Sequence, residues 1–246
     1  MSALFELIHE NADLLVVNKP ADLVCHPTKG DEYSSLISRA RLYLGAGSHP
    51  QLVNRLDRET SGVTLIARTA EAARQLRQIW ESRQVKKNYL AIIHGHPAAD
   101  AGLIDAPLGK DEASQVAIKD CVRADGAPAQ TAYSVEKRFF RRSAGKEDAE
   151  LPFSLLAVQP RTGRKHQIRI HLAHIGHPIV GDKLYGGDER IYLDFVHRRL
   201  LESQKQSLIL PNHALHAKRV AFEWRGLAHS YAAEPEPWFS EFLGSG

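Results

Sequence analysis

The chain has 246 residues, which is enough to bury a sizeable hydrophobic core as one large domain or two small ones. Its 32 basic and 29 acidic side chains nearly balance, so the net charge of +3 excludes histone-like binding driven by bulk charge. A nucleic-acid surface would have to come from local clustering of basic residues.

The cysteines and the N-terminal residues indicate the cellular compartment in which the protein is expected. Cys25 and Cys121 lie far apart and suggest no disulfide framework, so reduced thiols are expected. Residues 1–10 lack the pattern of a secretory signal, and no apolar run is long enough to span a bilayer. We therefore expect a cytoplasmic protein that does not enter a membrane.

The first part of the chain predicts strands that alternate with helices. Short apolar runs next to turn residues predict buried strands at residues 14–17, 63–67 and 89–93. Apolar residues at helical spacing predict a helix over 34–44 that ends near Gly45. A second helix is expected to follow Thr69, whose side chain is of the N-cap type.

The second part predicts more strands than helices. Residues 100–125 are rich in turn formers and predict a loop with short extended pieces. Strands are predicted at 131–139, 153–158 and 213–224, a hairpin or surface insertion at 141–151, and a helix at 166–175. Because strands and helices are interspersed, the predicted class is mixed α/β (α+β) with much antiparallel pairing.

The stretch from Asn54 to Gly62 places one carboxylate, Asp57, between Arg55 and Arg58. Nearby guanidinium groups favour the ionised carboxylate, which can then act as a nucleophile. Guanidinium forks also match phosphate geometry, so covalent chemistry on a nucleic acid is one interpretation. The other is a structural ion pair that braces a turn, and the stretch alone leaves both open.

Four motifs follow one another along the chain: Leu14 to Pro27, Asn54 to Gly62, Lys86 to Ala91, and Arg161 to Leu172. This series resembles the RluA-type family of RNA pseudouridine synthases, and the likeness runs from about Leu14 to about Trp224. Asn54 stands where that family usually has histidine, which leaves the subfamily and the RNA target open.

The resemblance implies a fold and a set of partners. It implies one pseudouridine synthase catalytic domain over residues 1–246, without an N-terminal S4-type RNA-binding domain. The implied architecture is a long mixed, mainly antiparallel sheet with flanking helices and a central catalytic cleft. It also implies structured RNA, either tRNA or rRNA, as the partner, with no cofactor, no nucleotide and no metal. We expect a monomer.

The resemblance assigns the catalytic residues. Asp57 takes the place of the essential aspartate, Tyr89 that of the family's tyrosine, and Arg169 that of an arginine that pairs with the aspartate. Asp57 would attack either ribose C1′ or uracil C6. Tyr89 offers a ring for stacking and a hydroxyl for proton transfer, although a strand tyrosine can also simply fill the core.

Basic residues around these motifs are candidates for RNA binding. Arg161, Arg164 and Lys165 precede a predicted helix, whose N-terminus would attract phosphate oxygens, or they are a solvated surface. Arg55 would occupy the space that a flipped base leaves or hold a flanking phosphate, and Arg58 is a further candidate for RNA binding. The alternative for Arg55 is a salt bridge with Glu59 or Asp57.

Two other patterns are interpreted as structural. His171 and His174 share a helix face, and His177 follows beyond a glycine break, but a zinc site needs suitable geometry and usually further ligands. The resemblance provides no metal role. The glycine-rich segment 181–187 fits neither a P-loop nor a dinucleotide fingerprint and predicts a loop at the edge of the cleft.

The leading functional hypothesis is an RNA uridine isomerase. The first alternative is a non-catalytic RNA-binding protein on the same scaffold, which would bind RNA without forming product. The second is a carboxylate-dependent nucleoside glycosidase, which would release free uracil.

Overall fold

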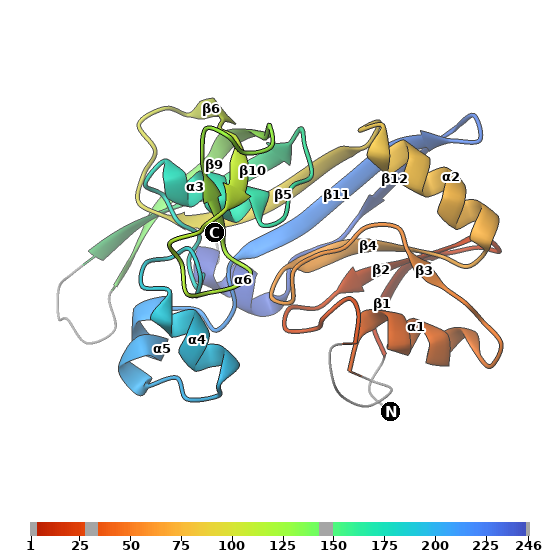
Figure 1. Cartoon of the computed structure of the whole chain (residues 1–246), viewed down its shortest axis with the longest axis horizontal. Coiled ribbons are helices and arrows are strands. Elements are labelled where there is room, and N and C mark those ends of the chain that lie inside the picture. The colour runs from red at the N-terminus through yellow and green to blue at the C-terminus, as the bar shows by residue number, and fades with distance from the viewer. Residues whose placement is uncertain (1–3, 28–33, 143–149, 245–246) are drawn as a thin grey trace. The chain divides into compact units, whose positions relative to one another are not determined.

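The computed structural model describes residues 4–27, 34–142 and 150–244 (Figure 1). The chain forms two compact units. Unit 1 consists of residues 1–89 and 216–246, and unit 2 of residues 90–215. Strands β5 (Lys86–His94) and β11 (Leu215–Trp224) each contribute residues to both units.

Unit 1 contains a mixed arrangement of strands. Strand β4 (Ser61–Ala67) lies between β2 (Leu14–Lys19), which is antiparallel to it, and β11, which is parallel to it. Strands β1 (Glu6–Glu10) and β12 (Leu227–Ala232) pair antiparallel with β2 and β11, and the short β3 (Gln51–Leu52) pairs with β4. The parallel β4–β11 pair joins segments far apart in sequence.

Helices cover both faces of β2 and β4 in unit 1. Helix α1 (Leu36–Leu44) packs against Leu15 and Val17, whereas α2 (Ala70–Glu81) packs against Leu14 and Val16. Successive side chains of a strand point to opposite faces, so these contacts bury all of β2. Figure 1 shows α1 and α2 on opposite sides of these strands, and a third helix, α6 (Pro237–Leu243), ends the unit.

The two helix starts follow capping rules. The hydroxyl of Ser35 accepts the N–H of Ser38, and that of Thr69 accepts the N–H of Ala72 at 3.2 Å. Each hydroxyl satisfies one of the N–H groups that a helix leaves without a partner at its start. Helix α1 ends at Gly45, whose φ of 87° suits a glycine.

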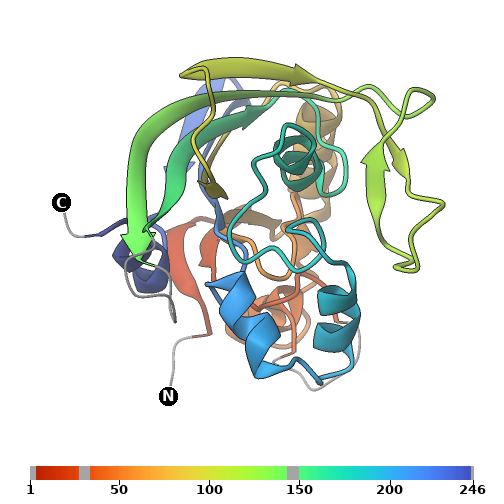
Figure 2. The same cartoon turned by 90° about the vertical axis from the view of Figure 1, so that its left-hand side faces the viewer.

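Unit 2 is built around the hairpin of β9 (Gln130–Arg142) and β10 (Glu150–Pro160), which lie side by side in Figure 2. Strand β6 (Ala101–Asp105) extends the sheet beyond β9, and β5 lies beside β10. A separate ribbon is formed by β7 (Leu108–Lys110) and β8 (Asp120–Val122). Its helices are α3 (Gln167–His174), α4 (Arg190–Val196) and α5 (Glu202–Leu208).

The predicted mixed α/β class is confirmed, and the predicted strands and helices all occur, with boundaries shifted by a few residues. A hairpin or surface insertion was expected at 141–151; strands β9 and β10 on either side pair with each other, and residues 143–149 lie outside the described residues. Helices α4, α5 and α6 were not predicted, because each is only seven residues long and α4 buries no side chain. The expectation of a single catalytic domain stays a prediction.

Within the part of the chain that the structure describes, no helix has both the length and the apolar character needed to cross a bilayer. Cys25 and Cys121 are both free thiols, the first buried and the second partly buried.

Candidate active site

Asp57 lies in unit 1, in the loop that connects β3 to β4. Its side chain is partly buried, and its carbonyl accepts the N–H of Thr60 at 3.2 Å, which closes the turn after it. The chain then enters β4 through Gly62, whose φ is +117°. The loop thus places a carboxylate at the entrance to a fully buried strand.

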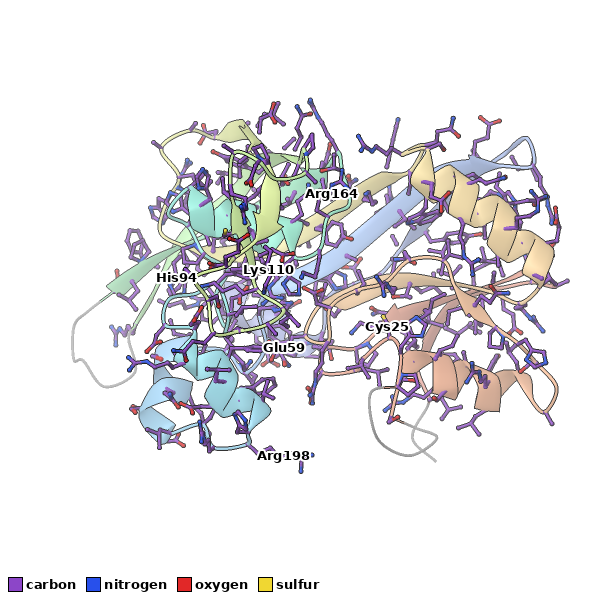
Figure 3. All side chains as sticks on the ribbon, viewed as in Figure 1. Cys25, Glu59, His94, Lys110, Arg164 and Arg198 are labelled. Atoms are coloured by element: carbon purple, nitrogen blue, oxygen red, sulfur yellow. The ribbon has the colours of Figure 1, made fainter. Side chains whose placement is uncertain are left out.

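Cys25 holds both backbone polar groups of Leu56, the residue before Asp57. Its Sγ donates to the carbonyl of Leu56 at 3.3 Å and accepts the N–H of Leu56 at 3.4 Å. Burial raises the pKa of the Cys25 thiol, so the group remains protonated and serves as a structural donor. Figure 3 labels Cys25, which follows β2, and Glu59, which lies in the Asp57 loop.

Asn54 ties the start of the loop to β4. Its Nδ2 donates to the carbonyl of Val63 at 3.2 Å, and its Oδ1 accepts the N–H of Leu65 at 2.8 Å. A side-chain amide offers one donor and one acceptor, so it can take the place of the backbone N–H and C=O groups that a paired strand would offer to β4. This contact gives Asn54 a structural role at the position where histidine is usual.

Lys19 is fully buried and contacts the Asp57 turn through its ammonium group. Its Nζ donates to the carbonyls of Pro20 and Leu23 at 2.8 Å and to that of Arg58 at 3.0 Å. Burial lowers its pKa to about 8, although the negative charges around it, Asp57 included, oppose that change. At neutral pH Lys19 is therefore a cation close to Asp57, with three donors matched to three acceptors.

The two arginines that flank Asp57 differ in their surroundings. Arg55 is exposed. The Nε of Arg58 donates to Oδ1 of Asp22 at 2.7 Å, in an ion pair that remains about half exposed to solvent. The sequence did not predict this pair, which links the Asp57 loop to the loop that follows β2.

Tyr89 lies on β5 and is partly buried. Burial, and to a lesser extent the negative charge of Asp57, raises the pKa of Tyr89 to about 12. The phenol therefore keeps its proton at neutral pH, and its hydroxyl lies within the electrostatic reach of the carboxylate. The structure thus brings Asp57 and Tyr89, two of the three predicted catalytic residues, into electrostatic interaction within unit 1.

Arg169 lies on α3 in unit 2, and its side chain is only 7% exposed. It forms a two-pronged ion pair with Asp182: Nε donates to Oδ2 at 2.7 Å and Nη2 donates to Oδ1 at 2.8 Å. The sequence had predicted Asp57 as its partner. That pairing would join the two units and stays a prediction.

The three basic residues before α3 are exposed. Lys165 pairs with Asp120 at 2.9 Å, and the Nε of Arg164 donates to the carbonyl of Pro128 at 3.3 Å. Figure 3 labels Arg164 in unit 2. Arg161, Arg164 and Lys165 are therefore available at one surface of this unit.

His171 is a buried structural residue. Its Nε2 lies 2.9 Å from the carbonyl of Ala106 and its Nδ1 lies 2.8 Å from the hydroxyl of Thr131. A carbonyl only accepts, so Nε2 carries the proton and Nδ1 accepts from Thr131. Among the described residues, no group of three or more potential metal ligands occurs.

Asp182 is the site residue that the sequence analysis missed. It had been assigned only to a glycine-rich loop, and its partner Arg169 had been given to Asp57. The available signal was a single acidic residue between Gly181 and Lys183 in a glycine-rich segment. Such a carboxylate needs a cation if it is buried.

Comparisons with known proteins bear on the family of the chain. Residues 13–174 match the family model described as RNA pseudouridylate synthase. The chain is 33% identical to ribosomal large subunit pseudouridine synthase D of Zymomonas mobilis over 88% of its own length and 64% of that protein. It is 36% identical to tRNA pseudouridine synthase C of Pectobacterium carotovorum over 81% of its own length and 51% of that protein.

The fold has a solved counterpart. Human RNA pseudouridylate synthase domain containing 1 superposes with a TM-score of 0.72 at 25% identity, covering 95% of this chain and 84% of the human one. By contrast, the chain spans only about half to two thirds of the length of the curated relatives it matches.

Proposed function

We propose that this chain, which belongs to the RNA pseudouridylate synthase family, converts uridines in RNA to pseudouridine. The observation that carries the proposal is the braced loop of Asp57. It lies within the span that matches the family and next to the buried cation Lys19, and the charge of its Asp57 contributes to the raised pKa of Tyr89.

The proposed reaction is an isomerisation. The bond between ribose C1′ and uracil N1 breaks, the base turns, and C1′ bonds to C5 instead. The hydrogen on C5 leaves as a proton and N1 gains a proton, so the mass of the RNA does not change. The reaction needs a nucleophile and a positioned proton carrier, with no electron carrier and no external source of energy.

Asp57 is the proposed nucleophile, and it attacks either C1′ of the ribose or C6 of the uracil. A carboxylate acts as a nucleophile only when it is ionised. The nearby charge of Lys19 favours that state, because an opposite charge stabilises the ionised form. Lys19 also fixes the backbone of the Asp57 turn through the carbonyl of Arg58.

Tyr89 and Arg169 are the other proposed catalytic residues. The protonated phenol of Tyr89 has a face on which a flipped uracil can stack and a hydroxyl that can transfer a proton. Arg169 supplies a permanent positive charge for the nucleophile, since guanidinium does not lose its proton in proteins.

The proposed substrate is structured RNA. The names of the two relatives point to ribosomal RNA for one and transfer RNA for the other, and we propose one of these classes here. Arg55, Arg58, Arg161, Arg164 and Lys165 are the proposed phosphate contacts. We further propose that the protein acts in the cytoplasm as a monomer.

Asp57→Asn and Asp57→Ala test the proposal. Both variants should abolish pseudouridine formation in unmodified total RNA, detected with a pseudouridine-specific chemical adduct, while their unfolding transitions stay close to wild type. Asp13→Asn is the matched control, because Asp13 is a carboxylate of unit 1 whose ion pair with Arg225 lies outside the Asp57 loop. Full activity of either Asp57 variant would refute the assignment.

The same assay separates the alternatives. Binding of RNA by the wild-type chain without any adduct would favour a non-catalytic RNA-binding protein. Release of free uracil would favour a glycosidase. Position-resolved mapping of pseudouridine in cells with and without the gene then identifies the modified uridine.

A further inference from the structure

The guanidinium of Arg169 is held along one edge. Its Nε and Nη2 donate in parallel to the two oxygens of Asp182, at 2.7 and 2.8 Å, and Asp182 is fully buried. Two parallel bonds between planar groups fix the plane of the guanidinium as well as its position. The opposite edge, which contains Nη1, then faces away from Asp182.

Asp182 is itself held in place by the backbone that follows it. Its Oδ1 accepts the N–H groups of Leu184 and Tyr185 at 2.9 and 3.0 Å. Burial alone would raise the pKa of Asp182, but the charge and hydrogen bonds of Arg169 bring it well below its usual range. Asp182 is therefore an anion whose orientation is set by the turn.

Glycines allow this turn to pack against its surroundings. A Cβ at Gly181 would overlap the carbonyl of Asn212, and Gly181 also has a φ of +81°. A Cβ at Gly186 would overlap the carbonyl of Asp182. The backbone therefore approaches so closely at both positions that only glycine fits.

A second contact restrains the flat face of Arg169. The carbon at the centre of its guanidinium lies 5.0 Å from the centroid of the Tyr185 ring. The hydroxyl of Tyr185 lies 2.9 Å from Nδ1 of His166, the residue immediately before α3, and 3.3 Å from the N–H of Asp120. Arg169 is therefore held at one edge by a carboxylate and on one face by an anchored ring.

Stability does not explain this arrangement well. Burying two charges costs desolvation that their attraction only partly repays, so apolar residues of similar size often stabilise a protein as much. A fixed cation is more useful where a reaction needs charge at a set position, because the groups need no reorganisation during the reaction.

We propose that Asp182, with Tyr185, is a positioning residue that sets the orientation of Arg169 for the isomerisation reaction. This inference rests on the proposed function. Asp182 acts through Arg169 and does not itself touch the uridine.

The test is a single-turnover measurement of pseudouridine formation with excess protein over unmodified RNA. Asp182→Asn keeps the size of the side chain and removes its charge. The rate should fall by about 10- to 100-fold, since small displacements of a catalytic group have effects of this order. The dissociation constant for the RNA should stay within about twofold of wild type, because Asp182 makes no proposed contact with phosphate. An unchanged rate overturns the inference.

A double-mutant cycle separates positioning from general damage. Arg169→Lys keeps a positive charge but lacks the fork that Asp182 holds. If Asp182 acts through Arg169, then adding Asp182→Asn to Arg169→Lys should slow the reaction little further. Fully additive effects of the two substitutions overturn the inference, because residues that act as one unit are not additive.

Three further variants provide a control, a test of rescue by charge, and a substitute in case Asp182→Asn does not fold. Glu189→Gln is the matched control: it breaks the ion pair with Lys119 at 2.7 Å in the same unit and should leave the rate unchanged. Asp182→Glu keeps the charge and should recover part of the rate lost in Asp182→Asn. If Asp182→Asn does not fold, Tyr185→Leu removes the ring beside Arg169 and should slow the reaction without adding to Arg169→Lys; a wild-type rate overturns the inference.

The result also distinguishes this inference from the function itself. Loss of activity in Asp57→Asn together with full activity in Asp182→Asn would refute only the positioning role of Asp182. Full activity in Asp57→Asn would remove the proposed mechanism on which it rests.

Discussion

At the scale of single residues, Lys19 shows how one buried charge can organise a loop. Its ammonium has three N–H donors, and three backbone carbonyls around it accept them. One of these carbonyls belongs to Arg58, so Lys19 connects β2 to the turn that presents Asp57. Removing the ammonium would leave buried acceptors without donors, which costs about 1–3 kcal/mol each.

Lys19→Met should therefore lower the free energy of unfolding by about 2 kcal/mol or more at pH 7. Urea denaturation, followed by circular dichroism, measures the loss. Lys218→Met is the control, because the Lys218 side chain is 29% exposed and pairs with Glu234 at the surface, where ion pairs contribute little. Equal stability of Lys19→Met and wild type would contradict the role of the three carbonyl contacts.

The lowered pKa of Lys19 also predicts a dependence of stability on pH. The folded protein loses this proton near pH 8, whereas the unfolded chain keeps it until about pH 10.5. Below pH 8 the folded protein therefore bears the cost of burying a charged Lys19. As the pH rises above 8, the folded protein loses this proton and the cost disappears. The difference in unfolding free energy between wild type and Lys19→Met should grow by up to about 3 kcal/mol from pH 8 to 10.5. A difference that stays constant or shrinks would show that the lysine is not desolvated.

At the scale of elements, the contact between β4 and β11 fixes the end of the Asp57 loop. Ser61 and Gly62 pair with His216 and Ala217 in parallel register. The buried Nε2 of His216 lies 3.0 Å from the carbonyl of Ala233, which only accepts, so Nε2 is the protonated nitrogen. Nδ1 then accepts the hydroxyl proton of Ser61 at 2.9 Å, and burial lowers the pKa of His216 so that it stays neutral.

Gly62→Ala should destabilise the fold strongly. A Cβ there would overlap the backbone of Ala217, and the φ of +117° is unfavourable for alanine. We expect a loss on the order of 3 kcal/mol, with reduced pseudouridine formation because the Asp57 turn enters β4 at this residue. Chemical denaturation and the adduct assay measure the two effects.

Gly45→Ala is the matched control for this substitution. Gly45 also has a positive φ, of +87°, but among the described residues no atom beyond its chain neighbours lies within 4 Å of the position that a Cβ would take. Its replacement adds backbone strain without overlap and should cost only about 1 kcal/mol. Similar losses for the two alanine variants would rule out close strand approach as the cause at Gly62.

At the scale of the whole molecule, a net charge of +3 means that RNA binding depends on where the basic residues lie. The three basic residues before α3 are exposed and provide one such surface in unit 2, although Lys165 is paired with Asp120. Each phosphate contact releases counterions, so affinity should fall as salt rises.

Arg161→Ala should weaken binding of unmodified RNA and reduce the slope of log affinity against log salt by about 1. Titrations between about 50 and 200 mM salt measure that slope. Arg190→Ala is the control, because Arg190 is exposed in the same unit and pairs with Asp188 outside the proposed RNA surface. An unchanged slope for Arg161→Ala would remove Arg161 from the set of phosphate contacts.

Much of the fold was predictable because its signals are local. The apolar runs of β2 and β4, the N-cap at Thr69 and the glycine that ends α1 all act over a few residues. The helices α4 and α5 lacked such signals, since between them only Leu208 is buried. The motif around Asp57 was recognisable for the same local reason, but its surroundings were not.

The order of residues by itself determined the mixed α/β class, the carboxylate on the turn before β4 and the family to which the chain belongs. Only the tertiary structure decided which groups contact the residues of the motifs. Asp182 pairs with Arg169, Asp22 pairs with Arg58, and the carbonyl of Arg58 accepts from Lys19. The physical reason is that the energy of a charge depends on burial and on partners distant in sequence, and neither is set until the elements pack together.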